Sequence, residues 1–295
     1  MSVIDTQSFV ALAKSKLTYK PVLHFAHANG MPSAVYEPLF MGLAEFFTIE
    51  YIAMLGNHSD YPVDNHWRSL TQQVIDSVQA ACKKHGVEQL VAVGHSLGGM
   101  CTLQALYRAP QYFSQAVLLD PPWLYGKISL LWHLAKTTDR LPLMQHRLMD
   151  KLSPAGISKH RRDVWDSRAD AYESLRNKGF FKNFEERSFK GYTEHALDER
   201  ADGKMTLAIP KSVEVAVFRT NPSWYWLTPN RAPKPPVTLI IGEDSIFLKR
   251  RFPQQINARL HINYQTHAGG HMFPLEYPES VALRVLALIA QQVSE

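Results

Sequence analysis

One stretch of sequence decides the fold of this 295-residue chain: Leu90-Val91-Ala92-Val93-Gly94-His95-Ser96-Leu97-Gly98-Gly99. Its first four residues are an apolar strand pattern, and the residues from Met100 to Leu106 continue as a helix. Ser96 lies between them in the pattern Gly-x-Ser-x-Gly, which places a serine at the tip of a sharp strand-to-helix turn. Side chains at the two glycine positions would crowd that turn, and the helix start directs backbone N–H groups towards the serine. The pattern therefore predicts an activated serine at position 96.

Short apolar runs rich in β-branched residues recur on both sides of this turn, at residues 22–26, 49–54, 90–93, 116–119, 237–241 and 262–264. Helical patterns separate these runs. In segment 67–81 the apolar residues recur every three or four positions, Pro110 ends the helix that follows Ser96, and a last helix is expected over 280–293. This alternation predicts an α/β fold with a mostly parallel sheet and helices on both faces.

The alternation is interrupted once, between Trp123 and Ala232, where charged helix-like segments such as 159–176 and 180–187 replace the strand pattern. Prolines bracket the interruption at 121–122 and 233–236. We therefore expect three parts: residues 1–122 as the first part of a core, 123–232 as an inserted helical cap or lid, and 233–295 as the second part of the core. Five of the six tryptophans lie in the insertion, where most would form its own small core and a few would line an apolar pocket over Ser96.

Composition and motifs limit the partners of the chain. Hydrophobic residues make up 45% and charged residues 20%, as in ordinary globular proteins. The net charge is +5, with the positive excess between residues 123 and 231, which indicates either a solvated helical surface or attraction for anionic substrates. No nucleic-acid motif is present, so no nucleic-acid partner is expected. No phosphate loop, dinucleotide fingerprint or His-x-x-x-His metal pattern is present, so neither a cofactor nor a metal is expected.

The expected location is the cytoplasm. The first 21 residues lack the basic start, apolar stretch and cleavage site of a signal peptide, and the longest apolar run is far too short to span a bilayer. The two cysteines, Cys82 and Cys101, both fall on predicted helices, so we expect no disulfide, as in a reducing compartment.

Ser96 needs a base, because a serine hydroxyl is a weak nucleophile at neutral pH. The favoured base is His271, which lies in the glycine-rich loop Ala268-Gly269-Gly270-His271 between the last strand and the last helix. Such a loop lies at the carboxyl edge of a parallel sheet, where Ser96 is also expected. His267 is the nearest alternative, and His27 is expected to anchor its own loop.

The base in turn needs an acid that fixes its tautomer. Asp244 is favoured because it follows the strand 237–241 and lies between the serine and the histidine in chain order. Asp120 is the alternative, since it directly follows the strand 116–119, and Glu243 is a weaker third. The oxyanion hole is expected to use the backbone N–H of Leu97 and a second N–H from the loop His27-Ala28-Asn29-Gly30-Met31-Pro32, with Asn29 or Ala28 as the donor.

These pieces together resemble the α/β-hydrolase superfamily, in particular lidded bacterial serine hydrolases with a His-Ala-Asn-Gly-x-Pro loop. The resemblance implies an eight-stranded, mostly parallel sheet, a helical cap after the strand that follows the serine turn, and the chain order serine, acid, histidine. Asp244 lies two residues after Gly242, where many relatives have the acid three residues after that glycine, and some members place it after the earlier strand, as Asp120 is placed. Ser96 differs from the aspartate that haloalkane dehalogenases and epoxide hydrolases use.

The resulting expectation is a serine hydrolase that cleaves a carboxylic ester or thioester through an acyl-enzyme on Ser96. Its substrate would be a small acyl compound with an apolar part. The alternatives are a lipase at a membrane surface, which is not favoured, an amide or carbon–carbon bond hydrolase, and a non-catalytic binding protein on the same fold. The oligomeric state is not predicted.

Overall fold

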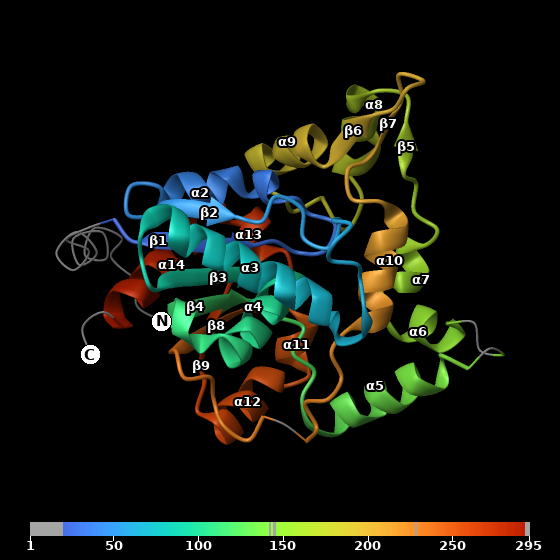
Figure 1. Ribbon diagram of the computed structural model, residues 1–295. Helices are drawn as coiled ribbons and strands as arrows, with labels where there is room; N and C mark the ends of the chain where they lie inside the picture. Colours follow the sequence, from blue (N-terminus) through green and yellow to red (C-terminus); the bar gives the residue numbers. More distant parts are fainter. Residues whose placement is uncertain (1–19, 142, 144–145, 228, 293–295) are drawn as a thin grey trace.

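The computed structural model describes residues 20–141, 143, 146–227 and 229–292 (Figure 1). Its main sheet has the strand order β2-β1-β3-β4-β8-β9, and all neighbouring strands are parallel. The strands are β1 (Val22–Ala26), β2 (Thr48–Tyr51), β3 (Leu90–His95), β4 (Phe113–Leu119), β8 (Val237–Gly242) and β9 (Asn263–His267).

Each of the six apolar runs expected from the sequence overlaps one of these strands. The expectation of eight strands is wrong for the described residues, in which the main sheet has six. Eight was implied by the resemblance, whereas the apolar runs themselves predict six.

Helices cover both faces of the sheet (Figure 1). One face packs against α3 (Arg68–His85) and α4 (Leu97–Arg108), and the other against α2 (Glu37–Leu43) and α14 (Pro278–Gln292). A further helix, α12 (Phe252–Leu260), precedes β9. The shorter helices of this part are η1 (Ser33–Tyr36), η2 (Asn65–Trp67), η3 (Pro110–Tyr112), α11 (Ile246–Lys249) and α13 (Phe273–Glu276).

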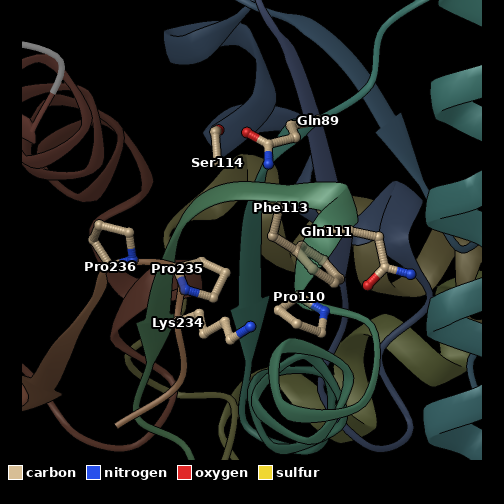
Figure 2. A pocket seen from close by; sticks show the side chains of 8 residues that line it. All are labelled: Gln89, Pro110, Gln111, Phe113, Ser114, Lys234, Pro235 and Pro236. Carbon is tan, nitrogen blue, oxygen red and sulfur yellow. The ribbon is translucent and has the colours of Figure 1, made fainter.

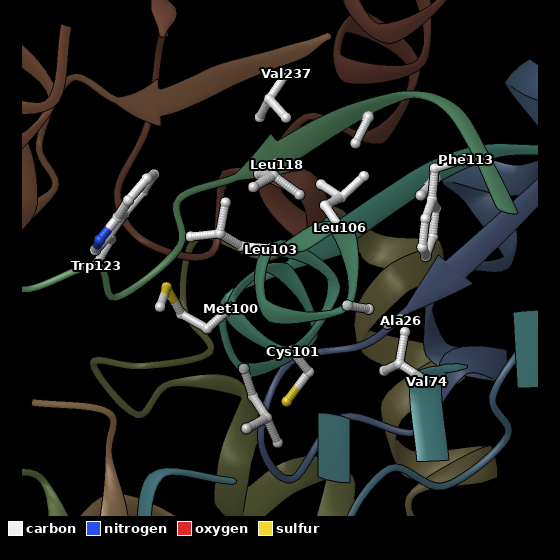
Figure 3. Close-up of a cluster of buried hydrophobic side chains, with 14 of the residues drawn as sticks. Ala26, Val74, Met100, Cys101, Leu103, Leu106, Phe113, Leu118, Trp123 and Val237 are labelled. Carbon is white, nitrogen blue, oxygen red and sulfur yellow. The ribbon is translucent and has the colours of Figure 1, made fainter. Parts of the chain in front are cut away.

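The apolar runs are continuous because both faces of the strands are buried. In β3, Leu90 and Ala92 belong to the hydrophobic cluster under α3 and α4, whereas Val91 and Val93 belong to the cluster on the other face. Successive side chains of a strand point to opposite faces, so a strand buried on both sides needs apolar residues at every position. Figure 3 shows the first cluster, with Met100, Leu103 and other α4 side chains beside the strand residue Leu118.

Residues 123–232, called the cap segment below, lie between β4 and β8 in the chain. They form the helices α5 (Gly126–Thr138), α6 (Arg147–Leu152), α7 (Ala155–Ser158), α8 (Arg168–Arg176), α9 (Glu186–His195) and α10 (Lys211–Thr220). In Figure 1 the helices α5, α6, α7 and α10 line one side of the molecule. The division of the chain into a core and a cap at residues 122 and 232 stays a prediction.

The cap segment is mostly helical, as expected, but the sequence did not predict all of its structure. It also contains a small antiparallel sheet with the order β5-β7-β6, formed by β5 (Val164–Trp165), β6 (Leu197–Glu199) and β7 (Met205–Leu207). Strands of two or three residues are too short for a period of two to be visible in the sequence. Trp165 of β5 is buried among apolar side chains of β6 and β7. The helix expected at 159–176 begins only at Arg168. Of the described helices, none is both long and apolar enough to cross a membrane.

Candidate active site

Ser96 lies at the sharp turn between β3 and α4, as its sequence pattern predicts. Its backbone has φ 52° and ψ −114°, a conformation that a residue with a side chain rarely adopts. A Cβ atom on Gly98 would lie 2.1 Å from the carbonyl oxygen of Ala26, and one on Gly94 would lie 2.7 Å from that of Gly98. Glycine is therefore required at both positions for β1, β3 and α4 to approach each other.

Three side chains from separate parts of the chain form a continuous hydrogen-bonded line. Nε2 of His271 is 2.9 Å from Oγ of Ser96, and Nδ1 of His271 is 2.6 Å from Oδ2 of Asp120. Ser96 follows β3, Asp120 follows β4, and His271 lies in the loop after β9, so all three meet at the carboxyl edge of the parallel sheet. The arrangement has the geometry of a Ser-His-Asp triad.

Asp120 is completely buried, and both of its carboxylate oxygens accept hydrogen bonds. Oδ1 accepts from the backbone N–H of Gly242 at 3.1 Å, and Oδ2 accepts from the hydroxyl of Ser245 at 2.7 Å as well as from His271. A carboxylate with this many donors is held in one orientation. It fixes the proton of His271 on Nδ1 and leaves Nε2 to accept the proton of Ser96.

The expectation that Asp244 contacts the histidine is wrong. Its side chain is 79% exposed and lies 3.8 Å from Nζ of Lys249. Glu243 is also exposed and contacts Thr266 at 3.4 Å. After β8 the chain turns so that Ser245, rather than Asp244, points inward to Asp120. Because β4 and β8 are neighbours in the sheet, both aspartates follow strands at the correct edge, and only the course of the turn distinguishes them.

The other two histidines considered from the sequence, His267 and His27, make hydrogen bonds away from Ser96. Nε2 of His267 lies 3.0 Å from the hydroxyl of Ser280, and its Nδ1 lies 2.8 Å from the carbonyl oxygen of Ala268. His27 donates from Nδ1 to the carbonyl oxygen of Ala28 and accepts the N–H of Leu55 at Nε2. Burial lowers the pKa of His27 to about 4, so it is neutral at pH 7 and anchors its loop as expected.

The backbone amides proposed for the oxyanion hole surround the same cavity as Ser96. Leu97, Asn29 and Ala28 all line it. The N–H of Ala28 already donates to the hydroxyl of Tyr36 at 3.3 Å. In the part of the chain that the structure describes, no protein group accepts a hydrogen bond from the N–H of Leu97 or Asn29. Asn29 is therefore the better of the two candidates for the second donor.

The cavity over Ser96 has a volume of about 890 Å³ and lies between the core and the cap segment. This volume is typical of sites for small organic ligands. Among its tryptophans are Trp132 and Trp165 of the cap segment, which confirms that tryptophans of the insertion line a pocket over the serine. Most of its walls are apolar, and the lysine, arginine, aspartate and glutamate side chains that line it are Arg161, Arg162, Lys178, Glu214 and Arg250.

A second cavity, of about 420 Å³, lies at the opposite ends of the strands (Figure 2). Residues that precede or begin β3, β4 and β8 line it, namely Gln89, Pro110, Gln111, Phe113, Ser114, Lys234, Pro235 and Pro236. None of these described residues is a histidine or a carboxylate, so this cavity lacks a base for its one serine. The larger cavity is the candidate active site.

Sequence reasoning missed Ser245, Tyr36 and His95, all of which are buried at the site. Their partners lie far away in the chain, 125 residues in the case of Ser245 and Asp120, and no local pattern indicates such contacts. Within the described residues, no group of three or more His, Cys, Asp and Glu side chains is arranged to hold a metal ion.

Comparison with known proteins identifies the class to which this fold and site belong. Residues 25–284 match the profile of the Alpha/beta hydrolase family, and the chain belongs to that family. It has the fold of that family.

Individual relatives are distant. The "Uncharacterized hydrolase YugF" of Bacillus subtilis is 27% identical over 212 residues, which cover 69% of this chain and 66%, just under two thirds, of that protein. The crystal structure of E-2-(acetamidomethylene)succinate hydrolase is similar, with a TM-score of 0.66 and 17% identity over 94% of this chain and 92% of the other. A thioesterase domain from the curacin biosynthetic pathway has a TM-score of 0.62 and 16% identity, with 91% of each chain covered. At these identities the structures establish the shared fold only.

Proposed function

We propose that this hydrolase cleaves a carboxylic ester or thioester through an acyl-enzyme formed on Ser96. The observation that carries the proposal is the line of two short hydrogen bonds, from Ser96 to His271 and from His271 to Asp120. In acyl transfer a serine needs a base within hydrogen-bond reach, and the base needs a third group to orient it.

In the first half of the proposed reaction, Nε2 of His271 takes the proton of Ser96 while Oγ attacks the acyl carbon. The carbonyl oxygen becomes an oxyanion that accepts hydrogen bonds from the N–H groups of Leu97 and Asn29, each worth about 3 kcal/mol by analogy with other hydrolases. Collapse of the tetrahedral intermediate breaks the bond to the leaving oxygen or sulfur, which receives the proton from His271. Asp120 stabilises the imidazolium during this transfer.

In the second half, water takes the place of the leaving group. His271 removes one proton from the water, whose oxygen attacks the acyl-serine carbon. The second tetrahedral intermediate releases the carboxylic acid, and Oγ of Ser96 regains a proton from His271. The protons balance over one cycle, and the side chains of Ser96, His271 and Asp120 supply the acid–base steps.

The apolar walls of the cavity favour a substrate with an apolar acyl part. Met31, Leu124, Val217 and Phe218 are among the side chains that line it. Burial of a methylene group contributes about 0.8 kcal/mol, so the length of the acyl chain is expected to govern the affinity for the substrate. The similarity in fold to the curacin thioesterase domain is compatible with a thioester as the substrate. A cytoplasmic location is also part of the proposal.

The test is a panel of matched esters and thioesters with graded acyl chains, assayed with the wild-type protein and with Ser96→Ala. We expect hydrolysis by the wild-type protein, loss of turnover in Ser96→Ala with an unchanged melting temperature, and labelling of Ser96 by a fluorophosphonate probe. Absence of both turnover and labelling would indicate a binding protein instead. Cleavage of amides or of carbon–carbon bonds, with no cleavage of esters or thioesters, would reassign the reaction class.

One observation favours a second candidate, a lipase that acts at a lipid surface. Ile157 is 80% exposed and Leu152 53% exposed, and both line the cavity from the cap segment. Exposed apolar side chains at a cavity wall suit contact with aggregated lipid. A sharp rise in rate when the substrate forms micelles would support the lipase, and a smooth saturation curve would support the esterase.

A further inference from the structure

A chain of three hydrogen bonds, two of them buried and the third partly buried, joins the oxyanion loop (residues 27–32) to the loop that carries His271. The N–H of Ala28 donates to Oη of Tyr36 at 3.3 Å, Oη of Tyr36 lies 2.7 Å from Nδ1 of His95, and Nε2 of His95 lies 2.9 Å from the carbonyl oxygen of His271. His95 directly precedes Ser96 in the chain. The three contacts therefore link all three backbone segments of the proposed reaction centre.

The direction of every hydrogen bond in this chain follows from its ends. A backbone N–H can only donate and a carbonyl oxygen can only accept. Oη of Tyr36 therefore accepts from Ala28 and donates its own proton to Nδ1 of His95, so the proton of His95 is on Nε2 and is donated to His271. One tautomer of one imidazole satisfies all of these groups.

Both side chains in the middle of the chain are fully buried, and neither has an alternative partner in water. This chain of hydrogen bonds requires a neutral His95. A second proton, on Nδ1, would remove the acceptor for the hydroxyl proton of Tyr36. Burial and the nearby His271 lower the pKa of His95 to about 3, so the arrangement is retained at neutral pH. Burial also raises the pKa of Tyr36, which keeps its hydroxyl protonated.

We propose that Tyr36 and His95 are positioning residues that hold the oxyanion loop, the serine turn and the His271 loop in fixed positions relative to one another. This inference rests on the proposed function of the site and extends it to two residues that do not touch the reacting atoms. With the N–H of Ala28 fixed on Tyr36, the next N–H, that of Asn29, is left to face the oxyanion. With the carbonyl oxygen of His271 fixed on His95, the imidazole of His271 is held at its distance from Ser96.

The geometry explains why both ends of this hydrogen-bond chain, at Ala28 and at His271, affect the rate of acyl transfer. The two oxyanion donors lie on separate segments, Leu97 on the serine turn and Asn29 on the oxyanion loop. Stabilisation of the tetrahedral intermediate requires both to point at one position, and a misplacement of about 1 Å can cost about a hundredfold in rate. Ground-state binding in the apolar cavity does not depend on this alignment.

The experiment compares Tyr36→Phe, His95→Leu and His95→Gln with two matched controls. Tyr61→Phe removes a tyrosine hydroxyl hydrogen bond to Asp76, and His24→Gln replaces a second buried, strand-borne histidine, which contacts Ser77. The substrate is the best ester or thioester of the panel above. Readouts are kcat and KM per active site titrated with fluorophosphonate, the affinity for a trifluoromethyl ketone that forms a tetrahedral adduct, and the melting temperature.

We expect Tyr36→Phe and His95→Leu to lower kcat by roughly 10- to 100-fold while KM changes less than threefold, because each leaves buried partners unpaired at the reaction centre. Affinity for the trifluoromethyl ketone should fall in parallel with kcat/KM. His95→Gln, which keeps one donor and one acceptor, should recover at least a third of the wild-type kcat. Both controls should retain kcat within twofold.

The inference is overturned if Tyr36→Phe and His95→Leu, as folded proteins, keep the wild-type kcat and ketone affinity, or if their losses match those of the controls. It is also overturned if KM changes and kcat does not. If His95→Leu does not fold, Tyr36→Phe decides the matter by the same criteria. A wild-type protein without turnover or Ser96 labelling contradicts the proposed function, whereas active variants contradict only the positioning role.

Discussion

The two walls of the candidate active-site cavity differ in how their buried polar groups are paired. On the sheet side, the buried carboxylate of Asp120 is fully paired, since its two oxygens accept from Gly242, Ser245 and His271. On the cap side, Nη2 of Arg161 and Oε2 of Glu214 form an ion pair, whereas Nε of Arg161 and Oδ1 of Asn221 are buried without a hydrogen-bond partner in the described residues.

This difference suggests that the sheet side of the cavity holds the reacting groups and that the cap side binds the substrate. Unpaired buried polar groups cost stability, whereas saturated ones hold a single geometry. A sheet edge with saturated contacts suits reacting groups that must stay within a fraction of an ångström of each other. A cap wall with loosely satisfied polar groups and an apolar lining suits a site that adapts to a ligand. Substitutions on the sheet side should therefore change kcat, and substitutions on the cap side should change substrate preference.

The largest expected effect comes from the two aspartates that follow neighbouring strands. Asp120→Asn should lower kcat by about a thousand- to ten-thousandfold, because an amide in this position favours the wrong tautomer of His271. Asp244→Asn, on an exposed side chain, should keep kcat within twofold. Steady-state kinetics on folded proteins measures both. Equal, small losses in the two variants would remove Asp120 from the proposed triad.

The next effect is on stability at the serine turn. Gly98→Ala places a Cβ atom 2.1 Å from the carbonyl oxygen of Ala26, so β1 or α4 must move. We expect a loss of more than about 3 kcal/mol in the free energy of unfolding and loss of hydrolysis. Gly179→Ala is the control in the cap segment, where a Cβ atom meets nothing within 4 Å. Urea unfolding of both variants tests the contrast, and similar stabilities would refute it.

Acid should destabilise the protein through its buried histidines. Burial lowers the pKa of His24 and His27 to about 4 and of His95 to about 3, below the ordinary value of 6.5. Below pH 6.5 the unfolded chain therefore binds protons that the folded chain does not, so stability falls as the pH falls towards 4. At pH 5 each of these histidines costs about 2 kcal/mol.

Urea unfolding at pH 7 and pH 5 measures this loss. The variant His24→Gln should show a smaller difference between the two pH values than the wild-type protein, because one of the groups is removed. An unchanged free energy of unfolding between pH 7 and pH 5 would mean that these histidines are protonated in the folded state.

The smallest effect is expected at the cap wall. Ile157→Ala removes an exposed apolar side chain from the cavity, so it should raise KM for long acyl chains by about three- to tenfold and leave kcat and the melting temperature nearly unchanged. The ratio of kcat/KM for long and short esters measures the effect. A loss of kcat with all chain lengths would show that the cap wall takes part in the chemistry.

Local sequence patterns predicted the sheet side well. The serine turn could be read because strand, glycines and helix are consecutive, and His271 because a glycine-rich loop follows the last strand. The acid could not be chosen between Asp120 and Asp244, since the choice depends on whether the turn after Gly242 points Ser245 or Asp244 inward.

The cap segment and the buried contacts exceeded what the sequence could predict. β5, β6 and β7 are two or three residues long, and the pairing of β5 with β7 joins residues about 40 apart, such as Val164 and Thr206. The contact of Tyr36 with His95 spans 59 residues and exists only in the folded chain. Both features arise from tertiary packing, for which one sequence carries no local signal.

The central claim, covalent catalysis by Ser96, is tested most directly by trapping the intermediate. The wild-type protein is mixed with an activated ester, quenched in acid within the first turnover and analysed by peptide mass spectrometry. We predict one peptide, containing Ser96, that is heavier by the mass of the acyl group, and no such peptide from Ser96→Ala. Turnover of the ester with no acyl adduct at any quench time, or an adduct on a different residue, would contradict the account.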